Sequence, residues 1–255
     1  MLHAAAKNGN IEIIELLVSQ GCDIDSRDRE GITPLMHTAL NGQQGAFQML
    51  IENGADPSFK AIDGFSLLHS AAQGGNTSII KKLLSLGLDV DSTDNDGRSA
   101  LMSAAFYGKQ HAFQMLIQNS ADPSLKTNNG SSLLHKAAQG GNPYIINELL
   151  SLGLDIDSRN NVGVTPLMSA AFAGKQNAFH MLLQNGADPS LKTKNGSSLL
   201  HFAAQSGNTC IINELSSLGL SIHLKDVYGK TPLTRAIERN NTDAVKFLTS
   251  KRAFK

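Results

Sequence analysis

The chain has 255 residues, a formal net charge of zero, 41% hydrophobic and 5% aromatic residues, and no tryptophan. A zero net charge argues against a general nucleic-acid binder, and no run approaches the roughly 18 apolar residues of a membrane helix, so we expect no membrane insertion. Cys22 and Cys210 lie far apart and imply no disulfide framework. Because the first residues also lack a signal-peptide pattern, we expect a cytoplasmic, intracellular protein, with the nucleus left open.

A glycine, here called the ladder glycine, recurs every 33 residues. Its context repeats too, as in Gly31-Ile-Thr-Pro-Leu-Met and Gly163-Val-Thr-Pro-Leu-Met. Such a period is typical of stacked copies of one small unit, each too small to bury its own apolar face. We predict one domain over residues 1–255, with a truncated copy near residue 1 and further copies beginning near residues 31, 64, 97, 130, 163, 196 and 229.

Within the copy over residues 97–129, the expected elements follow in chain order. Residues 99–107 read as a short helix with Leu101, Ala104 and Ala105 on one face. Gly108 supplies a permissive backbone for a tight reversal, and residues 109–119 form a second helix. Residues 122–130 contain Pro and Asn-Gly, which break helices, so they form a hairpin-like loop.

Two further glycines recur in phase. The reversal glycine is replaced only by Asn240 in the last copy, and Asn tolerates a left-handed backbone. The glycine that ends the second helix is replaced by Ser120, which we expect to cost about 1 kcal/mol if its φ is positive. The first copy begins inside its first helix, so we expect an excerpt of a longer array in which Leu2, Ile13 and Leu17 are poorly covered.

The pattern Gly-x-Thr-Pro-Leu-x-x-Ala-Ala-x-x-Gly, followed by two apolar pairs and Leu-Leu-x-x-Gly-Ala-Asp, closely resembles the ankyrin repeat. The best copies are Gly163–Asp188 and Gly31–Asp56. The resemblance covers the whole chain and implies an all-α fold, an ankyrin-repeat α-solenoid with a helix-turn-helix and a β-hairpin loop in each copy. The third, fifth and seventh copies depart from it, because Ser-Leu replaces Thr-Pro.

The sequence also contains a second, 66-residue period and an asymmetric distribution of charge. Residues 64–129 and 130–195 are identical at 47 of 66 positions. Residues 1–128 contain 9 Lys+Arg and 14 Asp+Glu, whereas residues 129–255 contain 13 and 8. This asymmetry either orients a partner or reflects drift of solvated surface residues. Alternate loops also differ in charge: Asp91, Asp94 and Asp96 are acidic, while Lys126, Lys192 and Lys194 are basic.

The repetition argues against metal and catalytic sites. His3, His69, His135 and His201 recur at 66 residues, which is about 20 Å in a stack of helices and too far for one metal ion. The resemblance implies instead that they bond to the neighbouring loop backbone. Catalysis needs unlike groups to converge, and no nucleophile elbow, zinc-protease motif or phosphate loop is present. We therefore expect no enzyme activity, catalytic residue, metal or cofactor.

The resemblance implies that a partner meets a concave groove formed by the loop tips and by the two residues before the reversal glycine. Aromatic residues alternate there with glutamines, as hot spots ringed by polar groups do, although packing of Phe106 and Phe172 against neighbouring inner helices is the alternative. The predicted partner-binding residues are Phe65, Arg98, Phe106, Tyr107, Gln139, Val164, Phe172 and Gln205.

The sequence thus predicts a monomeric protein–protein interaction scaffold that binds a protein partner across its concave groove and hairpin fingertips. The alternative is a structural spacer or spring segment of a larger protein, without a dedicated ligand. A designed or consensus-like array is a third reading, against which irregularities such as Ser120, Cys22 and Cys210 argue.

Overall fold

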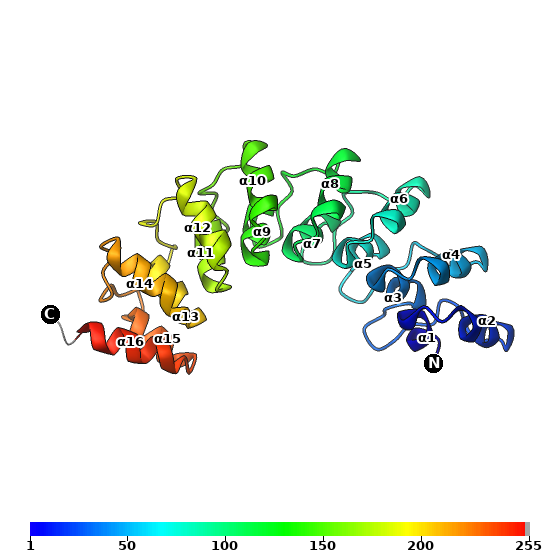
Figure 1. The fold of residues 1–255 in the computed structure, drawn as a ribbon, viewed down its shortest axis with the longest axis horizontal. Coiled ribbons are helices and arrows are strands. Elements are labelled where there is room, and N and C mark those ends of the chain that lie inside the picture. The colour runs from blue at the N-terminus through cyan, green and yellow to red at the C-terminus, as the bar shows by residue number, and fades with distance from the viewer. Residues whose placement is uncertain (253–255) are drawn as a thin grey trace. The chain divides into compact units, whose positions relative to one another are not determined.

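The structure is a computed structural model that describes residues 1–252. The chain divides into two compact units, unit 1 (Met1–Asn128) and unit 2 (Asn129–Lys255). Each unit contains eight helices within the described residues (Figure 1). The prediction of one domain over residues 1–255 stays a prediction, and the two units are described separately below.

In both units the helices form consecutive antiparallel pairs. Those of unit 1 are α1 (Leu2–Asn8), α2 (Ile11–Ser19), α3 (Pro34–Asn41), α4 (Gln44–Glu52), α5 (Leu67–Gly74), α6 (Thr77–Ser85), α7 (Ala100–Phe106) and α8 (Gln110–Gln118). Those of unit 2 are α9 (Leu133–Gly140), α10 (Pro143–Ser151), α11 (Pro166–Phe172), α12 (Gln176–Gln184), α13 (Leu199–Ser206), α14 (Thr209–Ser217), α15 (Pro232–Glu238) and α16 (Thr242–Arg252).

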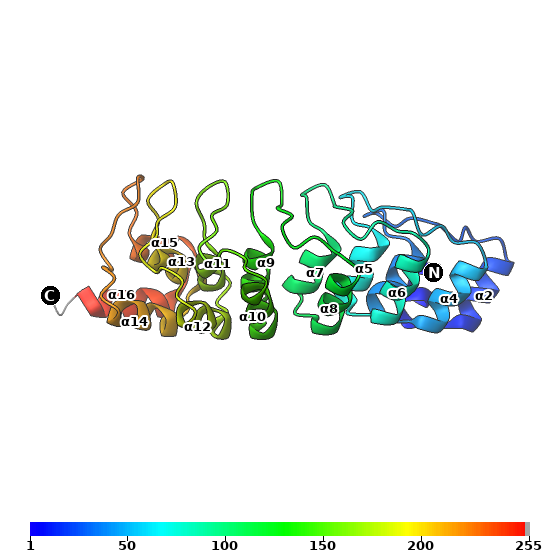
Figure 2. The ribbon, with the colours of Figure 1, turned by 90° about the horizontal axis from the view of Figure 1, so that it is seen from above.

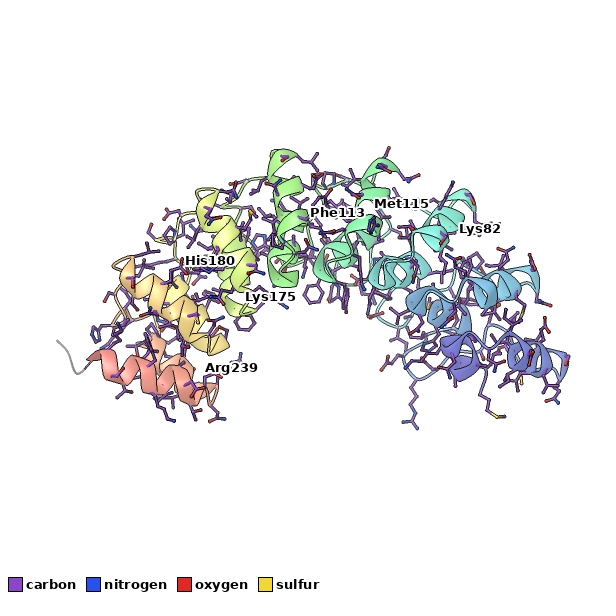
Figure 3. The ribbon with its side chains drawn as sticks, in the orientation of Figure 1. Lys82, Phe113, Met115, Lys175, His180 and Arg239 are labelled. Carbon is purple, nitrogen blue, oxygen red and sulfur yellow. The ribbon has the colours of Figure 1, made fainter. Side chains whose placement is uncertain are left out.

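The first helix of each pair, here called the inner helix, packs against the inner helices of its neighbours within the unit: α3 lies between α1 and α5, and α11 between α9 and α13. The second, or outer, helices carry residues such as Lys82 on α6 and His180 on α12 (Figure 3). This serial packing of helix pairs is the all-α solenoid arrangement that the sequence predicted.

Local sequence signals set the start of the inner helices. The Thr33 side chain accepts a hydrogen bond from the Met36 amide at 3.3 Å, and Pro34 occupies the first helical turn. Ser99 caps α7 in the same way. A side-chain oxygen at this position satisfies an amide that has no partner inside the helix, and proline there loses no hydrogen bond.

The predicted backbone reversals are confirmed. Gly42 ends α3 with φ 70°, and Asn240, which replaces the reversal glycine in the last copy, has φ 55°. Ser120 has φ 67°, so the one departure from the outer-helix glycine series does adopt a left-handed conformation. Such a conformation costs a non-glycine residue about 1 kcal/mol because its Cβ atom approaches the following carbonyl oxygen.

Mainly small and aliphatic side chains fill the core between the inner and outer helices, together with the buried rings of Phe47, Phe113 and Phe179. Leu134 on α9 and Leu200 on α13 are fully buried, as predicted for the inner-helix leucine. The expectation of poor coverage in the first copy is right for Ile13, which is exposed. It is wrong for Leu2 and Leu17, which are buried, because α1 and α2 pack against α3 and α4 of the following pair.

The loops that join one pair to the next project from the helices of each unit as narrow fingers (Figure 2). They are hairpins held by isolated bridges, such as Lys60 with Ser66 and Lys192 with Ser198. Neighbouring fingers are also joined near their tips: the Asn95 amide donates to the Asp63 carbonyl at 2.8 Å, and the Lys194 amide donates to the Val162 carbonyl at 2.9 Å. The fingers of each unit therefore form one connected edge.

Candidate functional site

Buried histidines fix the fingers to the inner helices. His69 Nδ1 accepts a hydrogen bond from the Ser66 amide at 3.3 Å, and its Nε2 lies 2.8 Å from the carbonyl oxygen of Arg98 in the next finger. In unit 2, His201 Nε2 lies 3.0 Å from the Lys230 carbonyl oxygen. Burial lowers the pKa of both histidines, although the bonded carbonyls oppose that shift. The predicted structural role of these histidines is confirmed.

Phe106 and Tyr107 form the exposed end of α7 in unit 1. Their side chains are 41% and 48% exposed, whereas the residues from Ala100 to Ala105 are all buried. The two rings contact each other edge to face, with centroids 5.1 Å apart. A large aromatic pair held in water at the end of a buried helix offers contact area for a partner.

A second aromatic pair lies in unit 2. Phe172 at the end of α11 is 44% exposed, and its ring meets that of Phe202 on α13 edge to face at 6.4 Å. Phe202 is half-buried and was missed by the sequence prediction, which considered on each inner helix only the two residues before the reversal glycine. A signal was available, because the equivalent residue two copies earlier is Lys136, a departure from the 66-residue repeat.

The two glutamines lie at the equivalent end of their own helices. Gln139 on α9 and Gln205 on α13 are half-buried. The carbonyl oxygen of Gln205 accepts a hydrogen bond from the Asn241 side-chain amide at 2.8 Å, which ties α13 to the following pair. Gln205 and Phe172 come from neighbouring inner helices of unit 2, so the Gln205 side-chain amide belongs to the copy that follows the one with the exposed Phe172 ring.

The three finger candidates are half-buried rather than exposed. The ring of Phe65 lies 5.0 Å from that of His69, and the carbonyl oxygen of Val164 lies 2.9 Å from Nε2 of His135. Arg98 Nε lies 2.6 Å from Asp94 and its Nη2 lies 3.1 Å from Asp96. Burial lowers the pKa of Arg98, but the hydrogen bond and charge of Asp94 outweigh it and raise the pKa above its usual value.

Apolar side chains at the finger tips were also missed. Ile62 in unit 1 and Val162, Val227 and Tyr228 in unit 2 are each 59% to 70% exposed. They occupy the one or two positions before a ladder glycine. Turns usually carry polar residues there, so an apolar residue at the tip is the sequence signal that would have found them.

Among residues 1–252, no group of three or more His, Cys, Asp or Glu side chains is arranged to hold a metal ion. No helix in the same part of the chain combines the length and the apolar character that a membrane crossing requires.

The chain was compared with models of known protein families. The family model described as ankyrin repeats (3 copies) matches residues 1–61, 58–127, 112–193 and 185–255. No curated protein matches the chain.

Proposed function

Because the chain belongs to the ankyrin-repeat family, whose members generally mediate protein–protein binding and are typically not enzymes, we propose that it is a protein-interaction scaffold without catalytic activity. The partner contacts the exposed ends of the inner helices and the neighbouring finger tips. Each unit carries its own set of these contacts. The scaffold itself is monomeric and intracellular, which fits the two unpaired, exposed cysteines, Cys22 and Cys210.

The exposure of Phe106 and Tyr107 carries the proposal. The residues from Ala100 to Ala105 on the same helix are buried in the stack, whereas the two rings at the end of the helix remain exposed to solvent. A ring placed there to stabilise the stack would be covered by the next inner helix, as the alternative reading required. Burial of two aromatic side chains against a partner is the usual source of a binding hot spot.

The experiment replaces both rings with alanine and measures stability and binding separately. Phe106→Ala/Tyr107→Ala should leave the melting temperature nearly unchanged, because exposed rings contribute little to folding. The affinity for a partner recovered with the full chain should fall by at least about 2 kcal/mol, or roughly thirtyfold. Isothermal titration of the purified pair measures this.

Phe113→Ala is the matched control, since Phe113 lies on α8 of the same copy and is buried. It should cost about 3–5 kcal/mol of stability without directly removing a partner contact. If the double variant loses several kcal/mol of stability and binds normally, the two rings are core residues. The spacer or spring reading would then replace the scaffold proposal.

A further inference from the structure

One row of side chains recurs in almost every finger, four residues before the ladder glycine. All but one of its members are basic: Arg27, Lys60, Thr93, Lys126, Arg159, Lys192 and Lys225. Arg27 in unit 1 and Arg159 in unit 2 each donate to the carbonyl oxygen of the equivalent residue in the next finger, Lys60 and Lys192. The row therefore runs across consecutive fingers at one repeat per step.

In unit 1 the fingers that carry this basic row also have an acidic position at their tips. The residue directly before the ladder glycine is Glu30, Asp63 or Asp96 in the first three fingers, and all three are exposed. In unit 2 the same position holds Asn129, Val162, Asn195 and Tyr228. Unit 2 thus has no carboxylate at the position that is acidic in the first three fingers of unit 1.

The fingers of unit 2 contain four acidic residues, Asp155, Asp157, Asp188 and Asp226, none of them directly before a ladder glycine. The exposed Asp155 carboxylate accepts a hydrogen bond from the Asp157 amide at 3.0 Å. The Asp157 carboxylate accepts a hydrogen bond from the Asp188 amide at 3.1 Å, and Asp188 accepts one from the Ser190 amide at 2.8 Å. Asp226 is buried and bonds Arg235 at 2.5 Å. Arg159, Lys192, Lys194 and Lys225 all remain exposed, and no salt bridge is found for them within the described residues.

Backbone hydrogen bonds join these tips into one edge. The Lys194 amide donates to the Val162 carbonyl, and the Val227 amide donates to the Asn195 carbonyl, both at 2.9 Å. Exposed Val162, Val227 and Tyr228 therefore alternate with the cationic side chains along the same edge. The surface combines positive charge with apolar contact area over three consecutive fingers.

We propose that the finger tips of unit 2 bind an extended, acidic segment of a partner protein that also carries apolar side chains. This inference rests on the proposed scaffold function and names the chemistry of the partner. Stacked helix pairs are about 10 Å apart, and a segment in the extended polyproline II conformation advances about 3.1 Å per residue with three residues per turn. Its every third side chain lies on one face, so an acidic side chain at every third residue meets one basic side chain in each finger, while neighbouring side chains contact the valines and Tyr228.

A nucleic acid is the other polyanion that a basic edge attracts. The whole chain has zero net charge, whereas proteins that bind nucleic acid through their phosphates carry a clear basic excess. Two of the three exposed apolar side chains on the edge are valines, which cannot stack on bases as aromatic rings do. These observations favour a protein segment.

The test selects binders to the full-length chain from a random peptide library whose members are long enough to cross three fingers. We expect enrichment of peptides with Asp or Glu spaced about three residues apart and apolar residues between them. Their affinity should fall as salt is raised. Lys192→Gln/Lys194→Gln/Lys225→Gln should weaken them by about tenfold, since exposed charge pairs contribute modestly each.

The matched control is Lys81→Gln/Lys246→Gln/Lys251→Gln, which removes three exposed charges from helix surfaces and should leave peptide affinity unchanged. Equal melting temperatures of the two triple variants show that both are folded. Neutral or basic peptides that lose binding only in Phe106→Ala/Tyr107→Ala would overturn this inference and leave the scaffold function standing. Failure to enrich any peptide would contradict both, and tighter binding of a single-stranded oligonucleotide than of the selected peptides would make the edge a nucleic-acid site.

Discussion

His69 Nε2 lies 2.8 Å from the carbonyl oxygen of Arg98, a residue 29 positions further along the chain. On its other side the ring accepts the Ser66 amide through Nδ1, so a neutral imidazole with its proton on Nε2 satisfies both groups. One side chain therefore caps its own helix and holds the next finger. His135 and His201 make the equivalent bonds in unit 2, to Val164 and Lys230.

Replacing this histidine should destabilise the fold. His69→Ala leaves the Arg98 carbonyl oxygen and the buried Ser66 amide without their partner, which costs about 1–3 kcal/mol. Chemical denaturation of the full chain measures the loss. His111→Ala on α8, where the side chain is exposed, should change stability by less than about 0.5 kcal/mol. Equal effects of the two variants would show that the buried histidine has no bridging role.

Stability should fall as the pH is lowered below the usual histidine pKa of 6.5. Burial keeps the pKa of His69 and His201 below that value in the folded chain. In this window the unfolded chain binds more protons than the folded chain, so protonation favours unfolding. Urea midpoints should therefore be lower at about pH 5.5 than at about pH 7.5, where these histidines are neutral in both the folded and the unfolded chain. His69→Asn/His201→Asn should flatten this dependence, and a midpoint that rises on acidification would contradict it.

Replacing a core leucine by alanine should destabilise the fold much more than replacing an exposed leucine. Leu200 on α13 is fully buried, so Leu200→Ala should cost about 2–5 kcal/mol through lost transfer energy and a cavity. Leu218, which follows α14, is 56% exposed, and its replacement by alanine should cost far less. Thermal or chemical denaturation of both variants provides the measurement. A loss below about 0.5 kcal/mol at Leu200 would mean that the inner-helix register is wrong.

The left-handed residue Ser120 offers a route to a more stable chain. Ser120→Gly should raise stability by up to about 1 kcal/mol, because glycine adopts φ 67° without the Cβ clash. The reciprocal change is Gly186→Ser at the equivalent position two copies later, where φ is 90° and no atom lies within 4 Å of an added Cβ. It should lower stability by a similar amount. A destabilising Ser120→Gly would indicate that the serine side chain makes a compensating contact.

Much of the fold was predictable because the repeat samples each position several times. The positive φ of Ser120 and Asn240 and the burial of Leu200 follow from which residue types persist at a position and which replace them. The bond of His69 to the next finger was implied by the resemblance to ankyrin repeats. Periodicity also separates the inner face from the outer face of each helix. These features depend mainly on backbone geometry and local packing, which each copy repeats.

Side-chain engagement was not predictable in the same way. Arg98 is a natural binding candidate by position, yet its guanidinium is occupied by Asp94 and Asp96, which only the folded finger brings within reach. Phe202 contacts Phe172 across two inner helices, a relation that depends on rotamers and not on period. Charge counts over the two halves of the chain do not locate the boundary between the two units at residue 128.

The most direct test of the proposed binding surface is to place a photo-crosslinking amino acid at position 107 or 172 and expose the full-length chain to its partner. Tyr144 on α10 is the matched control, because it is an aromatic residue that is 39% exposed but lies on an outer helix. We expect covalent adducts with the partner from positions 107 and 172 and none from position 144. Adducts from position 144 alone would place the partner on the outer helices and contradict the proposed binding surface.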